Sequence, residues 1–458
     1  MASPVSPEAA REDIGPHPFR VANFRYYWTA RLSATLAQSA MMLIISWQVY
    51  DVARTGGMSI SEAAAQLGLI GLIQFVPLFA LTPITGWTAD RLDRRHIARA
   101  TLALQIVGAA VLAWSTWSGT PSLATLFSVA FLTGIARAFS GPALGALAPN
   151  LVPAKTLPRA IAMSSISWQA GMVAGPGLGG YLYDWRPEAS YIAATALFAV
   201  ALLCLFMIGP VPRPAVERGR HPIRQMIDGL TYVRTNRLVQ AAITLDLFAV
   251  FLAGATALLP IYARDILKVG TEGLAQLGAA PALGATVTAL FFSFRPLRTN
   301  VGTKMLGAVV VFGIATVVFG LSTSMPLSLA ALFVVGSSDM FSVFVRQSLI
   351  QLHTPDAMRG RVSAVSGLFI SASNELGEFR AGLAGAAFGP ILAVVGGGAL
   401  AVLVTGLCAW AFPSLRRADR FVAPDEQILG EASSKTTPDP EPPAMVAGLN
   451  VKAEKGQP

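Results

Sequence analysis

Six ionisable side chains lie inside long apolar stretches of this 458-residue chain: Arg137, Asp246, Asp339, Glu375, Glu378 and Arg380. A charged residue at the centre of a membrane-spanning helix costs about 2.5–3.5 kcal/mol on insertion scales, so such residues are usually functional. A carboxylate in a low-dielectric site can take up and release protons near working pH. The four carboxylates are therefore candidates for proton exchange, and the two arginines are candidates for tuning it.

The elements that must hold these side chains are helices. Twelve apolar stretches between Tyr26 and Phe412 are each long enough to cross a bilayer, which takes about 20 residues. Backbone polar groups in lipid must pair within their own segment, so we expect α-helices. A large soluble helical protein is the alternative, but 53% hydrophobic and only 13% charged residues argue against it. The expected fold class is an all-α polytopic membrane protein with 12 transmembrane helices.

Lysine and arginine concentrate in alternate loops of this pattern. One set of loops carries most of them, whereas the opposite loops hold only four, which are Arg54, Arg186, Arg264 and Lys268. Because positive loops stay in the cytoplasm, we expect both termini inside the cell and a multi-pass location in the plasma (inner) membrane. The net charge of +9 then reflects topology, and nucleic acid is not an expected partner.

The chain divides into two halves at a basic, proline-rich linker. We expect a cytoplasmic segment at 1–20, an N-terminal six-helix bundle at 21–210, a cytoplasmic linker at 211–238, a C-terminal six-helix bundle at 239–413 and a disordered cytoplasmic tail at 414–458. In the linker, Ile223–Leu238 has apolar residues at helical spacing, which predicts an amphipathic helix on the membrane surface.

The two halves also match each other at an offset of 202 residues. Under this offset Arg159 falls on Arg361, Ser164 on Ser366, Gly175 on Gly377 and Gly180 on Gly382. Two related six-helix halves are a known layout of secondary transporters. The repeat therefore predicts two bundles with a cavity between them near the bilayer midplane.

The same offset places Arg137 on Asp339. We expect these opposite charges to face each other across the central cavity, and the alternative is that each is capped locally. Glu375 and Glu378, three residues apart, share a helix face. An ion pair of Glu378 with Arg380 at the outer rim, and a purely structural role for Asp246, are further alternatives that stay open.

The loop after the second stretch carries the first diagnostic motif, G-W-T-A-D-R-L-D-R-R. It resembles the G-x-x-x-D-R-x-G-R-R signature of the major facilitator superfamily, with Asp93 in place of the second glycine. The matching positions are Gly86, Asp90, Arg91, Arg94 and Arg95. We expect Asp90 to face the start of the eleventh stretch near Gly360 and Arg361, as a latch that ties the halves together when the cytoplasmic side is closed. An ordinary positive loop is the alternative.

The fifth stretch carries a second motif, G-M-V-A-G-P-G-L-G-G. Glycines four residues apart on one helix face let a partner backbone approach closely, and a proline bends the helix. The residues concerned are Gly171, Gly175, Pro176, Gly179 and Gly180. The motif resembles the pattern of the exporter, or drug:proton antiporter, branch of the superfamily, and Arg137 with Gly141 resembles that branch's R-x-x-x-G element. A glycine zipper that serves packing alone is the alternative.

Together these segments are similar to the enterobactin-exporter-like branch of the superfamily, over nearly all of residues 19–413. The resemblance implies a secondary active transporter, in two six-helix bundles, that exports a small amphipathic molecule, siderophore-like or drug-like, in exchange for protons. Import of a small nutrient with protons is the alternative. The partners so implied are the small-molecule substrate, protons and the lipid bilayer, and we expect a monomer.

Other function classes find no support in the sequence. No pore loop or repeated filter indicates a channel, and no G-x-x-x-x-G-K-[ST] phosphate loop indicates an ATP-driven pump. The four histidines include no ligand-spaced pair, so neither a metal site nor a cofactor is expected. The scattered ionisable residues do not form a nucleophile and base, so an enzyme is not expected.

Overall fold

The protein is helical throughout the described part of a computed structural model, which comprises residues 17–145, 147, 150–209, 222–295, 297 and 299–418. The first six long helices are α1 (Ala22–Thr55), α2 (Ile60–Arg91), α3 (Arg94–Trp117), α4 (Leu123–Gly145), α5 (Leu157–Trp185) and α6 (Pro187–Met207). Short 3-10 turns, η1 (Pro18–Arg20) and η3 (Ala154–Thr156), precede α1 and α5.

The second series begins after α7 (Pro222–Thr235), a short helix in the linker. It consists of α8 (Arg237–Ala253), α10 (Gly270–Phe294), α11 (Val301–Leu321), α12 (Met325–Leu352), α13 (Asp356–Phe388) and α14 (Pro390–Ala411), with α15 (Pro413–Arg416) after them. Between α8 and α10 the chain continues through η4 (Ala255–Leu258), α9 (Leu259–Ile261) and the π-helical turn η5 (Tyr262–Ile266).

Ten helical segments of the described chain are long and apolar enough to cross a membrane. One of them, Arg237–Ile266, runs from α8 through η5 as a single span. The remaining long helices, α5 and α13, have 29 and 33 residues but contain more glycine, serine and charge. The polytopic all-α prediction is confirmed, and the count of twelve spans is consistent with these helices.

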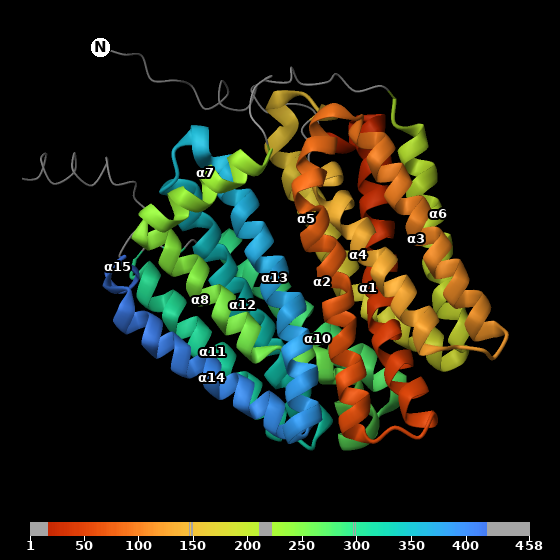
Figure 1. Ribbon diagram of the computed structural model, residues 1–458. Helices are drawn as coiled ribbons and strands as arrows, with labels where there is room; N and C mark the ends of the chain where they lie inside the picture. The colour runs from red at the N-terminus through yellow and green to blue at the C-terminus, as the bar shows by residue number, and fades with distance from the viewer. Residues whose placement is uncertain are drawn as a thin grey trace, which may run out of the picture. The chain divides into compact units, whose positions relative to one another are not determined.

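The helices pack in two groups. Within the first group α1 lies against α5 and α6, and α4 against α2 and α3. Within the second, α12 lies against α10 and α11, and α14 against α8 and α11. Figure 1 shows the first group in red to yellow-green and the second in green to blue. The two groups belong to one compact unit that ends at Phe421, so the domain boundaries expected from the sequence stay a prediction.

Two long seams join the groups: α13 lies against α2, and α10 lies against α5. We call the side where α6 ends and α7 lies the linker side, and the side where α1 ends and α2 begins the far side (Figure 1). Helix α7 contacts α13 and α8 on the linker side. The expected segments 1–20 and 414–458, and residues 211–221 of the linker, fall largely outside the described residues.

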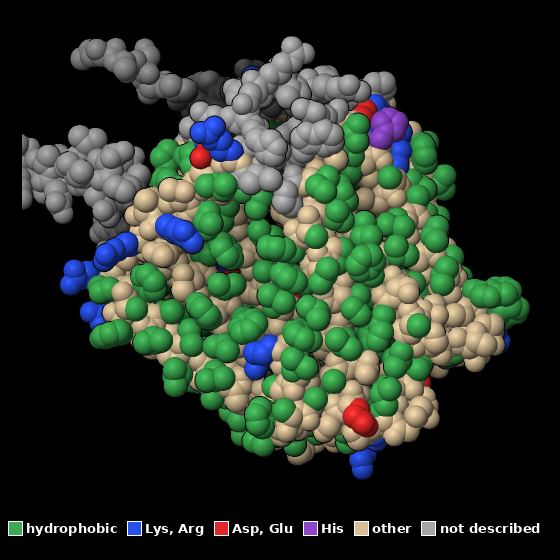
Figure 2. All heavy atoms as spheres, viewed as in Figure 1, with side chains coloured by type: hydrophobic (Ala, Val, Ile, Leu, Met, Phe, Trp, Pro, Cys, Tyr) green, Lys and Arg blue, Asp and Glu red, His purple; other side chains and the backbone are tan. Residues whose placement is uncertain are grey.

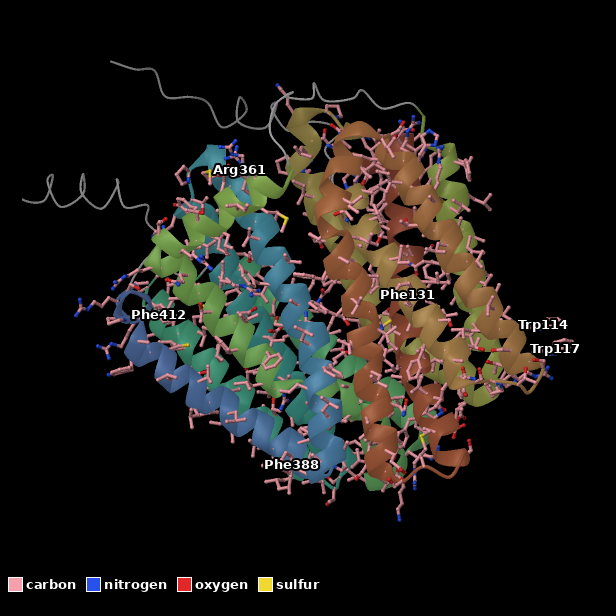
Figure 3. All side chains as sticks on the ribbon, in the orientation of Figure 1. Trp114, Trp117, Phe131, Arg361, Phe388 and Phe412 are labelled. Carbon is pink, nitrogen blue, oxygen red and sulfur yellow. The ribbon has the colours of Figure 1, made fainter. Side chains whose placement is uncertain are left out.

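The surface agrees with a membrane environment. Hydrophobic side chains spread over the helices on the face seen in Figure 2, and charged ones gather mainly toward its edges. Trp114 and Trp117 project outward from the far-side end of α3 (Figure 3), with 67% and 65% of their surfaces exposed. Tryptophan is enriched where a membrane meets water, so this pair marks the far-side interface.

Candidate functional site

Arg137 is the centre of the candidate site. It lies on α4, and its Nη1 donates to Glu375 Oε1 of α13 at 2.6 Å and to Gln74 Oε1 of α2 at 2.9 Å. The Glu375 side chain is only 5% exposed, whereas that of Arg137 is 28% exposed. The ion pair therefore joins the two helix groups. The side-chain amide of Gln74, which is buried, accepts a second hydrogen bond from the same arginine.

Arg137 contacts Glu375 and not Asp339, so the expectation that Arg137 and Asp339 face each other across a cavity stays a prediction. Helix α4 packs against α2, and α2 packs against α13, so the Arg137 side chain reaches across α2 to Glu375. Asp339 lies on α12 and has no hydrogen bond or ion pair to another described residue. The offset repeat relates equivalent positions of the two halves, but equivalence does not bring them into contact.

Glu378 lies one turn beyond Glu375, on the α2 seam. A Cβ placed on Gly71 would come within 2.5 Å of the Glu375 carbonyl oxygen and 3.0 Å of Glu378 Cβ. A glycine at this position therefore allows α2 to pack directly against the backbone of α13 at Glu375 and Glu378.

Arg380 does not form the rim ion pair with Glu378 that was left open. Its Nε donates to the carbonyl oxygen of Phe251 at 2.9 Å. Helix α8 ends at Ala253, before Gly254, so this carbonyl has lost its helical partner. A guanidinium at a helix C-terminus also faces the negative end of the helix dipole. Arg380 therefore stabilises the break in the seventh span.

Asp246 forms a buried ion pair with Arg346, a residue that sequence analysis missed. Arg346 Nη1 of α12 donates to Asp246 Oδ2 of α8, and the two side chains are 2% and 5% exposed. The signal was present, because V-F-V-R-Q puts an arginine inside the apolar tenth stretch. The pair lies wholly within the second helix group.

A row of polar groups continues from this pair along α12. Asp339, Ser342 and Arg346 are spaced three and four residues apart, so they follow one helix face. Within the described residues, neither Ser342 Oγ nor Arg346 Nε has a hydrogen-bond partner, although both atoms are buried. This row therefore retains unused donors and acceptors between Asp339 and the Asp246–Arg346 pair.

The glycines of the fifth stretch face α1. A Cβ on Gly171 would meet Thr35 Cβ at 2.7 Å, and one on Gly175 or Gly179 would meet an α1 carbonyl oxygen at 2.9 Å. Ser39 Oγ donates to the Gly171 carbonyl oxygen at 2.8 Å across this contact. Pro176 is buried in the same helix. The motif thus lets α5 and α1 touch backbone to backbone.

Gly180 and Gly382 face the other helix group instead. A Cβ on Gly180 would meet the Thr271 carbonyl oxygen of α10 at 2.7 Å, and one on Gly382 would meet that of Ala64 in α2, also at 2.7 Å. These glycines are equivalent under the offset of 202 residues, and so are the two seams they occupy. Both contacts lie toward the far side, where they bring the backbones of the two groups close together.

Charged side chains add a second far-side closure. Asp51 Oδ1 of α1 accepts from Arg264 Nη1 of η5 at 2.6 Å, and Arg54 Nη2 lies 3.8 Å from Asp265 Oδ1. Tyr50 also donates a hydrogen bond to Asp265. Each element contributes one acid and one arginine, and each acid faces the arginine of the other element. Sequence analysis placed Arg54 and Arg264 in loops, as indicators of topology, and predicted no contact between them and the acids.

The latch of the first motif falls largely outside the described side chains. Gly86, Asp90 and Arg91 belong to the last turns of α2, but their surroundings and side chains are not part of the described structure. Arg361, which the latch was expected to face, is labelled in Figure 3. Its Nη1 lies 3.4 Å from Asp228 Oδ2 of α7. The latch stays a prediction.

Asp93, which replaces the second glycine of the superfamily's loop signature, has a local structural role. Asp93 caps the N-terminus of α3 by accepting from the Arg95 backbone nitrogen at 2.9 Å, and its carboxylate also binds the Arg95 side chain at 2.7 Å. The hydrogen bond from Arg95 lowers the pKa of Asp93 to about 2. The neighbouring Arg94 starts the same helix.

The arrangement defines the class of protein. Among the described residues no group of three histidine, cysteine or acidic side chains is placed to hold a metal ion. Two helix groups that meet at glycine seams, with buried charges at their boundary, form a transport protein rather than an enzyme. The chain belongs to the Major Facilitator Superfamily, whose family pattern matches residues 27–378.

Among characterised proteins of this superfamily, the chain is similar to enterobactin exporters. Enterobactin exporter EntS of Escherichia coli O1:K1 / APEC is 26% identical over 388 residues, which cover 84% of this chain and 88% of that protein. The protein of the same name from Citrobacter koseri (strain ATCC BAA-895 / CDC 4225-83 / SGSC4696) gives the same figures.

Solved structures show the same fold at low identity. A POT family transporter in complex with 5-aminolevulinic acid has a TM-score of 0.69 at 14% identity, covering 86% of this chain and 96% of that one. A D-xylose-proton symporter has a TM-score of 0.65 at 14% identity, covering 84% and 97%. These neighbours establish the fold alone.

Proposed function

We propose that this protein exports a small amphipathic molecule, siderophore-like or drug-like, in exchange for protons by alternating access. The observation that carries the proposal is the Arg137–Glu375 ion pair, because its members come from opposite helix groups. If the far side opens by parting α2 from α13, this pair must break. Each transport cycle then changes the charge environment of Glu375.

The broken and formed states of the pair have opposite effects on Glu375. With Arg137 beside it, the carboxylate is favoured in its ionised form, and without that cation a proton compensates the buried charge. Glu375 would then take up a proton when the far side is open and release it after the far side closes. Glu378, on the same face, is the second acid within reach of this exchange.

We assign supporting roles to the second buried pair. Asp246 and Arg346 join α8 to α12, and the polar row from Asp339 leads to them. We further propose that water enters between the groups from the linker side and reaches this row. Asp339 and Asp246 are therefore candidates for passing protons between Glu375 and that side.

Export is favoured by the similarity to enterobactin exporters and by the α5–α1 glycine contact. The linker side carries α7 and the start of α3 with Arg94 and Arg95. It would face the cytoplasm, together with both termini. A small molecule that leaves the cytoplasm would then enter from the linker side, and we expect one chain to form the complete path as a monomer.

Inverted membrane vesicles test direction and coupling together. Energised vesicles are acidic inside, and a proton-coupled exporter then accumulates cargo from the medium. The probes are a catecholate siderophore and a fluorescent amphipathic dye, each with and without an uncoupler. Uncoupler-sensitive accumulation supports the proposal. Accumulation only in right-side-out vesicles would instead support proton-coupled import, and gradient-independent flux would exclude coupling.

A further inference from the structure

A groove of about 630 Å³ lies on the second helix group, between α10 and α11, with α12 as its floor. Both α10 and α11 pack against α12. The groove opens outward, since Val287, Phe291 and Val311 expose about half of their surfaces. The residues that shape it are Val287 and Phe291 of α10, Gly307 and Val311 of α11, and Ser337 and Phe341 of α12.

The walls of this groove are preformed. A Cβ on Gly307 would meet nothing within 4 Å, so the glycine leaves room rather than permitting helix contact. On the opposite wall Phe292 packs between Phe341 and Phe344, with ring centroids at 5.0 and 4.5 Å. These aromatic contacts hold the floor and one wall in place, so the space does not collapse when it is empty.

One cation lies at the linker-side end of the groove. Lys304 is exposed in the first turn of α11, and among the described residues it is the single charged one of the lining. Val311 lies seven residues farther, about 10 Å along the helix axis, and ten residues from the start of α11 at Val301. The groove thus runs from the membrane edge about 15 Å inward, which is the depth of one leaflet.

We propose that this groove binds one acyl chain of an anionic phospholipid of the linker-side leaflet, with the phosphate held by Lys304. An ammonium group is a common phosphate ligand, and a long lysine side chain reaches readily from a helix end to the headgroup level. A zwitterionic lipid such as phosphatidylcholine carries a cationic group beside its phosphate, and this cation weakens the attraction of the headgroup to the lysine. A second copy of the chain in a two-fold contact would place one Lys304 near another.

Native mass spectrometry of the purified full-length protein tests this site without a transport assay. The protein is equilibrated with equal amounts of phosphatidylglycerol and phosphatidylcholine of distinguishable mass. We expect one tightly retained phosphatidylglycerol, and we expect Lys304→Gln to lower its preference over phosphatidylcholine about fivefold. Gly307→Leu, which fills the groove, should reduce retention of either lipid.

Matched variants separate the groove from general surface effects. Gly406→Leu on α14 is the steric control, because a Cβ there also meets nothing within 4 Å. Arg234→Gln on α7 is the charge control, since Arg234 is exposed outside the groove. All four variants change exposed positions, and equal thermal stability confirms that they are folded.

Three outcomes would overturn the proposal. The first is equal retention of both lipids by the unsubstituted protein. The second is an unchanged preference in Lys304→Gln, or the same loss in Arg234→Gln. The third is a photoactivatable acyl chain of phosphatidylglycerol that labels the helices evenly, instead of concentrating on α10 and α11 beside Phe291 and Val311.

Discussion

Arg137 and Glu375 are 238 residues apart in the chain, yet their side chains meet at 2.6 Å across the boundary between the two helix groups. The contact spans α2, whose Gln74 is buried and accepts from the same arginine. A pair placed at such a boundary responds to every separation of the groups. Under the proposed function, this contact links Glu375 to the relative position of the two helix groups.

Substitution of Glu375 should separate coupling from movement. In Glu375→Gln the acid can no longer exchange a proton, so gradient-driven accumulation of cargo should fall at least tenfold. Downhill exchange of labelled cargo should remain measurable in proteoliposomes. Gln74→Leu, which removes the amide and keeps the acid, should retain coupling. Normal accumulation in Glu375→Gln would place the proton site elsewhere.

Removing one member of the Asp246–Arg346 pair should destabilise the protein more than replacing both members with apolar residues. Removing one partner from a pair this well buried leaves an uncompensated charge and costs about 3–5 kcal/mol. We therefore expect Arg346→Met to lower the unfolding temperature of the detergent-solubilised protein strongly. The double variant Asp246→Leu/Arg346→Met should recover most of that loss. A double variant less stable than either single one would contradict this account.

The seam glycines should control closure of the far side. A side chain on Gly382 would strike the Ala64 carbonyl oxygen at 2.7 Å, and a backbone atom in a packed helix yields little. Gly382→Val should therefore keep α2 and α13 apart and reduce transport at least tenfold. Gly396→Val on α14, where a Cβ meets nothing within 4 Å, is the control. Disulfide trapping between cysteines at positions 51 and 264, in a chain without Cys204 and Cys408, measures the closure.

The reciprocal ion pairs should make far-side opening sensitive to charge. Asp51→Arg alone sets two cations against each other and should favour the open far side. The exchanged pair Asp51→Arg/Arg264→Asp should restore closure, as followed by spin-label distances across the far side. The difference should shrink at high salt, because these side chains are 30–39% exposed and screened. Equal distances in the single and exchanged variants would exclude a role in closure.

The Asp93 cap should contribute a constant amount of stability at physiological pH. Its folded pKa of about 2 lies below the ordinary value of 3.8, so the contribution is complete above about pH 5 and is lost as the pH falls through the folded value. Asp93→Ala should cost about 1 kcal/mol, as for other N-cap aspartates. Thermal unfolding from pH 5 to 8 should show the same cost throughout, whereas a cost that varies across this range would disprove the assignment.

Patterns repeated along the chain predicted the helical fold well. The apolar stretches indicated long helices, and the amphipathic spacing at Ile223–Leu238 indicated a helix that the structure places at Pro222–Thr235. Such signals are local, since each segment must satisfy its own backbone in lipid. Residues far apart in sequence carried no comparable signal for their contacts.

The side-chain partners were therefore harder to predict. The offset repeat identified Gly180 and Gly382 as equivalent, but it gave no sign of the contact between Arg137 and Glu375, which depends on how α2 passes between α4 and α13. The burial of Glu375 also depends on a distant segment, since α2 packs against α13 at Gly71 and only 5% of the Glu375 side chain is exposed. Arg346 was overlooked although its position in an apolar stretch was visible.

At Gly180 and Gly382 the backbone of one helix group lies against the backbone of the other, so these two contacts can part and rejoin without a change of rotamer. Under the proposed alternating access, positions outside the cargo path can therefore influence the rate of the cycle. Substitutions that reshape the path between the groups can alter what is carried while these contacts stay the same. Evolution can then change the transported molecule at one set of positions and the transport rate at another set in the same chain.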